Sequence, residues 1–229
     1  MRSHRAVLVA AALAAAGARP AAGQLAVRGA GLLEVAEHRV DAGSGVEQSS
    51  GTLFGAEGML WFGPRFELQV RGVAGKLNAD SAGATARDVA EGTVRASVLT
   101  VPWLALHAGF TARSYTTALV RQRWTALRFG GEARFAFVGD DITGLMRAEI
   151  LPSVTVSGLE HPNRAFAAGA GLEWRLGGVS LGVRYDLERY DFPPAAGVTR
   201  HEQFSVLSAH AGIRLGHGAA TAPPEPMAR

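Results

Sequence analysis

Hydrophobic and polar residues alternate one by one along most of the chain. Between residues 64 and 74, Phe66, Leu68 and Val70 share one face, and charged or amide side chains occupy the other. A period of two is typical of a β-strand and cannot form the apolar stripe of a helix. The alternation is equally clear at 89–101, 127–137, 179–190 and 207–215, and it is weaker at 25–40, 51–62, 103–115, 143–157 and 164–176. The pattern predicts an all-β chain of about ten strands.

The connections between these strands alternate between short and long. Short turns rich in glycine and proline are expected at Gly63-Pro64, Pro102, 139–141 and 177–178. The longer and more polar connections are expected at 41–50, 75–88, 158–163 and 191–200, with a smaller one near 116–120. Short turns at one end and longer loops at the other are typical of a closed antiparallel up-and-down transmembrane β-barrel. Ten strands fit best, and eight remain an alternative.

The first residues have the three-part pattern of a secretory signal peptide. Arg2 and Arg5 precede an apolar run that ends in small residues, which predicts a signal peptide at 1–23, the barrel at 24–216 and a flexible Pro/Ala-rich tail at 217–229. Lys and Arg total 23 and Asp and Glu total 20. Removing Arg2, Arg5 and Arg19 leaves 20 of each, so no basic surface for nucleic acid is expected. The 229 residues include no cysteine, which excludes a disulfide scaffold.

Aromatic residues gather near the predicted strand ends. On the turn side these are Trp61, Phe62, Phe66, Trp103, Phe135, Phe137 and Trp174, and on the loop side Tyr115, Tyr185, Tyr190 and Phe192. Two such bands are typical of the aromatic girdles of a membrane barrel. The alternative is that aromatic residues are simply common in β-strands, and the girdle is favoured.

In its export signal, alternation and turn asymmetry, the chain resembles the Gram-negative outer-membrane β-barrel proteins over about residues 25–216. The resemblance implies an outer-membrane location, a lipid environment, insertion by the outer-membrane assembly machinery and a monomeric state. One feature departs from the family pattern. Family members commonly end on an aromatic residue that closes the last strand, whereas here the sequence continues past Leu215 into the tail.

If the apolar face meets lipid, the charged face lines the lumen. The expected lumen charge network comprises Glu67, Arg71, Glu91, Arg95, Arg128, Glu132, Arg134, Arg147, Glu149, Glu173, Arg175, Arg184, Asp186 and Arg214, with Glu57, Arg113, Glu188 and His210 on the same face. Buried arginines and carboxylates are tolerated when they pair. The favoured interpretation is a filled lumen with a structural or surface-interaction role, and the alternative is a narrow, porin-like path whose arginines select anions.

Catalysis is not expected from this sequence. Candidate groups at the loop-side rim are His38, Asp41, Asp80, Asp88, His161, Asp191 and His201, but none matches the acid–histidine motif of the ten-stranded omptin proteases. Ser208 and His210 share a face, yet a nucleophile and base also need a third orienting group. No metal-ligand spacing or cofactor loop is found, so no metal or cofactor is expected. The alternatives are an outer-membrane barrel enzyme, either protease or lipid-modifying, and a secreted soluble β-sandwich.

Overall fold

The computed structural model describes residues 25–43, 45–139, 141–195 and 197–215. The expected signal peptide at 1–23 and tail at 217–229 lie outside these residues. The described residues form ten strands: β1 (Leu25–Asp41), β2 (Val46–Phe62), β3 (Phe66–Ala79), β4 (Arg87–Val101), β5 (Leu104–Thr116), β6 (Arg121–Val138), β7 (Ile142–Val156), β8 (Arg164–Leu176), β9 (Val179–Asp191) and β10 (His201–Leu215). In the described part of the chain, no helix is long and apolar enough to cross a membrane.

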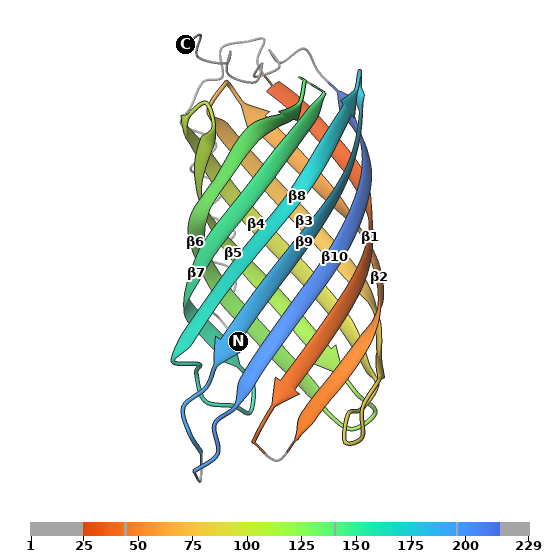
Figure 1. Cartoon of the computed structure of the whole chain (residues 1–229), viewed down its shortest axis with the longest axis vertical. Helices are drawn as coiled ribbons and strands as arrows, with labels where there is room; N and C mark the ends of the chain where they lie inside the picture. The colour runs from red at the N-terminus through yellow and green to blue at the C-terminus, as the bar shows by residue number, and fades with distance from the viewer. Residues whose placement is uncertain (1–24, 44, 140, 196, 216–229) are drawn as a thin grey trace, which may run out of the picture.

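The strands form one closed sheet, and each pairs antiparallel with its neighbours in the sequence (Figure 1). Closure is made by β1 and β10, whose register runs from Val27 opposite Leu215 to Asp41 opposite His201. The prediction of a ten-stranded up-and-down barrel is therefore confirmed. The eight-stranded alternative is wrong, and so is the two-sheet sandwich, because a single sheet closes on itself.

Short and long connections lie at opposite ends of the barrel. The turn end carries the turns after β2, β4, β6 and β8, together with Leu25 and Leu215, and is uppermost in Figure 1. The loop end carries the connections 42–45, 80–86, 117–120, 157–163 and 192–200. Three loops were predicted too long. The ranges 41–50, 75–88 and 191–200 include strand residues, since β1 to β4 and β9 extend further towards the loop end than apolar alternation indicates.

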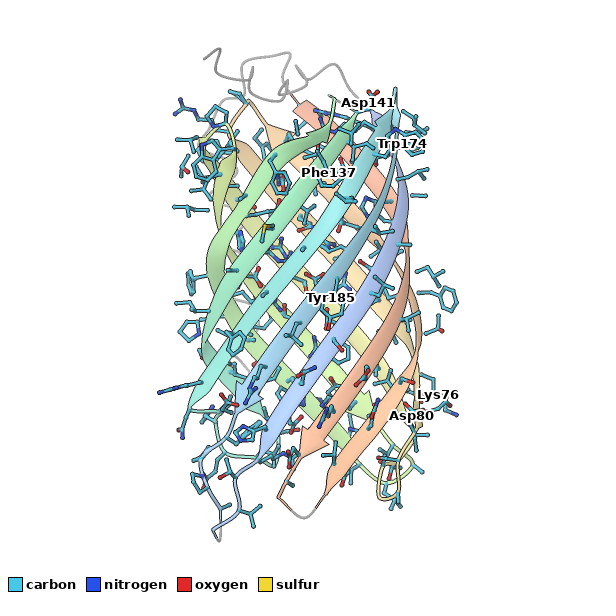
Figure 2. The ribbon with its side chains drawn as sticks, in the orientation of Figure 1. Lys76, Asp80, Phe137, Asp141, Trp174 and Tyr185 are labelled. Carbon is cyan, nitrogen blue, oxygen red and sulfur yellow. The ribbon has the colours of Figure 1, made fainter. Side chains whose placement is uncertain are left out.

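The outer wall changes from apolar to polar along each strand. On β1, Leu33 and Val35 are exposed, whereas the next outward residues are Glu37 and Arg39. On β2, Phe54 is followed towards the loop end by the outward residue Thr52. Neighbouring strands change together: Thr52 pairs with Lys76, and Lys76 pairs with Asp88 on β4. Figure 2 shows Lys76 and Asp80 at the loop end, and Asp141 and Trp174 at the turn end.

The inner wall changes in the opposite sense. Towards the turn end it carries arginines and glutamates, whereas towards the loop end it carries a buried apolar cluster. The members of this loop-end cluster are Leu32, Ala36, Leu53, Val73, Leu77, Val89, Tyr115, Trp124, Ala126, Leu151, Val154, Val156, Ala167, Tyr190, Phe192, Phe204 and Val206. The barrel therefore has two sections. The section near the turns is polar inside and apolar outside, and the section near the loops is apolar inside and polar outside.

Candidate functional site: the filled lumen

Glu149 on β7 lies at the centre of the charged lumen. It is buried and accepts hydrogen bonds from Arg128 and, at 2.8 Å, from His107 Nε2. Arg147 Nε and Arg95 Nη2 lie 3.6 and 3.7 Å from its Oε1 atom. Several guanidinium groups therefore converge on one carboxylate.

Glu188 and Glu91 extend this network across the barrel. Arg128 contacts Glu188 as well as Glu149, and Arg113 Nη2 lies 2.8 Å from Glu188 Oε2 and 2.5 Å from Glu91 Oε2. Arg71 bridges Glu91, at 2.6 Å, and Glu34. Each of these arginines contacts two carboxylates, so the pairs form one continuous chain of charges that links β1, β3, β4, β5, β6, β7 and β9.

Towards the turn end the network continues around a cavity. Arg28 Nη2 lies 2.7 Å from Glu57 Oε1, and Arg28 Nη1 lies 2.5 Å from Glu173 Oε2. Arg134 Nε donates to Glu132 at 2.7 Å. A cavity of about 240 Å³ lies between these groups and reaches the turn residues Gly63 and Gly177.

The structure places all fourteen residues of the expected network on the inner wall, and brings most of them into ion pairs. Close pairs among them are Arg71–Glu91, Arg128–Glu149, Arg134–Glu132, Arg134–Glu67, Arg147–Asp186 and Arg184–Asp186, and Arg175 lies 3.4 Å from Glu173. Arg95 stays 3.7 Å or more from its nearest carboxylates. Arg214 forms no ion pair with a described residue, and its guanidinium lies over the Trp61 ring, 4.8 Å from the centroid.

Sequence reasoning missed several inner-wall groups, chiefly on β1. Arg28 and Glu34 lie in the region of weak alternation, where glycine and alanine separate the larger apolar residues. A signal was present, since both occupy even positions opposite Leu25, Val27 and Leu33. His107 on β5 was also missed, because it lies in the weakly alternating segment 103–115.

The loop-end cluster surrounds one buried polar pair. His38 Nε2 lies 2.9 Å from Glu202 Oε2, and both side chains are buried. Arg87 Nη1 lies 3.1 Å from His38 Nδ1, so the neutral tautomer that satisfies both contacts donates from Nε2 to Glu202 and accepts at Nδ1. The imidazole stacks on the Tyr115 ring at 4.8 Å between centroids. This set of contacts holds His38 in place between the charged lumen and the loops.

The aromatic residues on the loop side do not form a girdle. Tyr115, Tyr190 and Phe192 are buried inside the barrel, whereas Tyr185 is exposed on the outer wall. The prediction of a second band is therefore wrong for three of its four members, because the inner wall is apolar at that level. On the turn side, by contrast, Phe62, Phe66, Trp103, Phe135, Phe137 and Trp174 are all exposed. The prediction is wrong for Trp61, which lies on the inner wall and donates from Nε1 to Glu67 at 3.1 Å.

Comparison with known proteins shows the fold. The structure resembles the outer membrane protease OmpT from Escherichia coli with a TM-score of 0.57, at 9% sequence identity, over 86% of this chain and 98% of that chain. The fold is that of an outer-membrane β-barrel. The translocator domain of the autotransporter NalP from Neisseria meningitidis matches with a TM-score of 0.43 at 13% identity, over 92% of this chain and 95% of that one. No protein-family model and no curated protein sequence matches the chain.

The serine, histidine and aspartate side chains that the sequence offered as candidate catalytic groups have different partners in the structure and do not form one site. Ser208 Oγ donates to the Arg184 carbonyl at 3.2 Å, and His210 Nε2 lies 3.7 Å from Glu173. At the rim, His201 Nδ1 lies 2.6 Å from Asp191 Oδ1, with both residues on the outward face of their strands. The described residues hold no cluster of three or more metal-ligating side chains.

Proposed function

We propose that this chain is an exported, monomeric outer-membrane barrel with a closed lumen and a structural or surface-interaction role, and that it is not an enzyme. The section near the turns spans the bilayer. The section near the loops projects from the outer surface as a rigid support that displays five connections. Loops on a rigid scaffold are where binding residues are usually found, so partner recognition is assigned to the loop end.

The observation that carries this proposal is the coincident reversal of polarity on the two walls. A wall in contact with lipid is apolar outside, whereas a barrel in water is polar outside and packs an apolar core. Transmembrane strands need about 9–11 residues, and β1 and β2 each have 17. About seven residues at a rise of 3.3 Å and a tilt near 40° would project roughly 18 Å beyond the bilayer.

Two features support a closed lumen over a porin-like path. The charged side chains pair across the barrel instead of lining a channel, and the loop-end cluster fills the projecting section with apolar groups. A hydrated ion that entered from the turn end would have to break buried ion pairs and then cross this cluster. Both steps are costly, because a buried charge without a partner is strongly destabilising.

The absence of an enzymatic role is supported by where the rim groups lie. His38 is buried and held by Glu202 and Arg87, so its ring nitrogens are occupied. The Asp191–His201 pair lies on the outer wall, where the nearest cationic neighbour is Arg189, with its Nε 3.0 Å from Asp191. A nucleophile, base and orienting group in one cavity would favour catalysis. Such an arrangement is not found among the described residues.

Cysteine labelling on intact cells tests the proposal. Because the chain has no cysteine, a single cysteine at Asn78, beside the loop end, or at Gly178, in a turn, gives an unambiguous site. A membrane-impermeant maleimide should label Asn78→Cys on intact cells and should label Gly178→Cys only after the outer membrane is opened. Equal labelling of both on intact cells, or labelling of Gly178→Cys alone, would contradict the proposed orientation.

A further inference from the structure

The turn-end cavity carries more arginine than carboxylate. Six arginines line it: Arg28, Arg95, Arg134, Arg175, Arg184 and Arg214. The carboxylates that line it are Glu57, Glu67, Glu132 and Glu173. Among the lining residues the formal balance is therefore six against four, an excess of two positive charges. Two of these arginines also face carboxylates outside the lining: Arg184 Nε lies 3.1 Å from Asp186 Oδ2, and Arg95 Nη2 lies 3.7 Å from Glu149 Oε1. The deeper network therefore offsets part of the excess, and the rest faces the cavity.

Several of these arginines have donors that the protein leaves unused. Arg95 is buried yet donates no hydrogen bond to a described residue, with Glu149 and Glu132 at 3.7 and 3.9 Å. Arg28 is only 7% exposed, and its Nε atom is buried without a hydrogen-bond partner among the described residues. Near the mouth, Arg214 lies over Trp61 and contacts no described carboxylate. A buried guanidinium without a partner is costly, which favours an acceptor from outside the protein.

We propose that this turn-end cavity binds a small dianion, a phosphate or a short dicarboxylate, that enters from the side of the turns. A guanidinium group presents a planar fork of donors that matches the oxygen atoms of phosphate and carboxylate. A dianion would offset the remaining positive charge and supply oxygen acceptors to arginines that line the cavity, such as Arg175 and Arg214 near its mouth. At about 240 Å³ the cavity is below the usual 300–1,000 Å³ of drug-sized sites, so the ligand is small.

Because the cavity ends at the paired network, the bound anion does not pass through the barrel. The site is a pocket that opens at the turn end alone, and ligand and solvent exchange through that opening. This goes beyond the proposed function, which assigns recognition to the loop end. The binding itself does not depend on the orientation of the barrel in a membrane. A negative result would therefore leave the proposed function standing.

Titration of the folded, detergent-solubilised full chain tests the site. Inorganic phosphate and succinate are added separately at low, constant ionic strength, with acetate as a monoanionic comparator, and binding is followed by calorimetry and by tryptophan fluorescence. We expect saturable binding of at least one dianion, and the dianion that binds identifies the class. We expect acetate to bind at least tenfold more weakly. The fluorescence change should disappear in Trp61→Phe, since Trp61 lies beneath Arg214.

Three variants that each remove one arginine charge show where on the protein the anion binds. Arg175→Gln and Arg214→Gln should each weaken it about tenfold. Folding should be retained, because Arg214 has no ion pair with a described residue and the single ion pair of Arg175, with Glu173 at 3.4 Å, is partly exposed. Arg123→Gln, which removes an exposed arginine on the outer wall, should bind like the wild type. The proposal is overturned if neither dianion binds, if acetate binds as tightly, or if all three variants weaken binding equally.

Discussion

Replacing Glu149 with glutamine isolates the contribution of the lumen network to stability. The change preserves side-chain volume but removes a buried charge contacted by Arg128 and His107, with Arg147 and Arg95 within 4 Å. Removing one partner of a buried ion pair typically costs 3–5 kcal/mol. Arg128 keeps Glu188 and Arg147 keeps Asp186, so we expect the lower end, about 3 kcal/mol.

The free energy of unfolding is measured by urea titration of the barrel folded in lipid vesicles, followed by tryptophan fluorescence. Asp191→Asn is the matched control. It removes a carboxylate from the outer wall, where Arg189 Nε lies 3.0 Å and His201 Nδ1 2.6 Å from Asp191 Oδ1. Because these contacts are open to solvent, the change should cost less than about 1 kcal/mol. The two variants differ chiefly in burial, so the comparison separates lumen pairing from surface charge.

A second substitution gives the reasoning a sharper test. Arg95 forms no close contact, so Arg95→Gln in the wild type should change stability by less than about 1 kcal/mol. In the Glu149→Gln background the same change removes an excess buried cation and should stabilise the barrel by about 1 kcal/mol, a coupling of the size seen for residues in contact. If Glu149→Gln costs no more than Asp191→Asn, or if Arg95→Gln destabilises both backgrounds equally, the paired-network account is refuted.

Three further predictions concern the two walls and the packing between strands. Ile150→Arg, on the apolar outer wall, should destabilise the barrel in vesicles by about 2–4 kcal/mol, whereas Thr155→Arg, outward on the same strand nearer the loops, should cost less than about 1 kcal/mol by the same urea titration. Leu53→Ala in the loop-end cluster should cost about 2–5 kcal/mol in thermal or urea unfolding, and an unchanged midpoint would show that the cluster is not packed. Gly130→Ala should destabilise by about 1–3 kcal/mol, because the added Cβ would lie 2.1 Å from the Ala148 carbonyl oxygen on β7. Gly58→Ala, with open space around it, should be neutral.

The sequence predicted the barrel and the inward face well because both depend on local alternation. A period of two puts Arg71 and Glu91 on one face whatever the rest of the chain does. Which charges meet depends on more than alternation. The Arg28–Glu173 contact joins residues 145 positions apart, and it is set by the barrel's register and by strand closure. Those quantities have no local signature, so partner identities could not be predicted.

The loop-end section was mispredicted for a related reason. Polar residues were interpreted as loops, yet β2 already begins at Val46. In its first residues the outward Gln48 and Ser50 alternate with the buried Ser49. Here the strand is defined by backbone pairing with β1, and hydrophobic alternation carries little signal. Tyr115 and Tyr190 were placed in an outer girdle from their position near strand ends alone. The period of two in fact puts them on the same faces as Arg113 and Glu188, which line the lumen.

The central claim is that the reversal of polarity marks the membrane surface, and spin labels on β2 test it most directly. Phe54 and Ser50 both occupy the outward set of positions on β2, four residues apart, on either side of the reversal. A nitroxide at Phe54→Cys in vesicles should collide with oxygen more than with a water-soluble nickel chelate, and one at Ser50→Cys should show the opposite preference. Equal preference at the two positions, or preferential oxygen access at Ser50→Cys, would contradict the account.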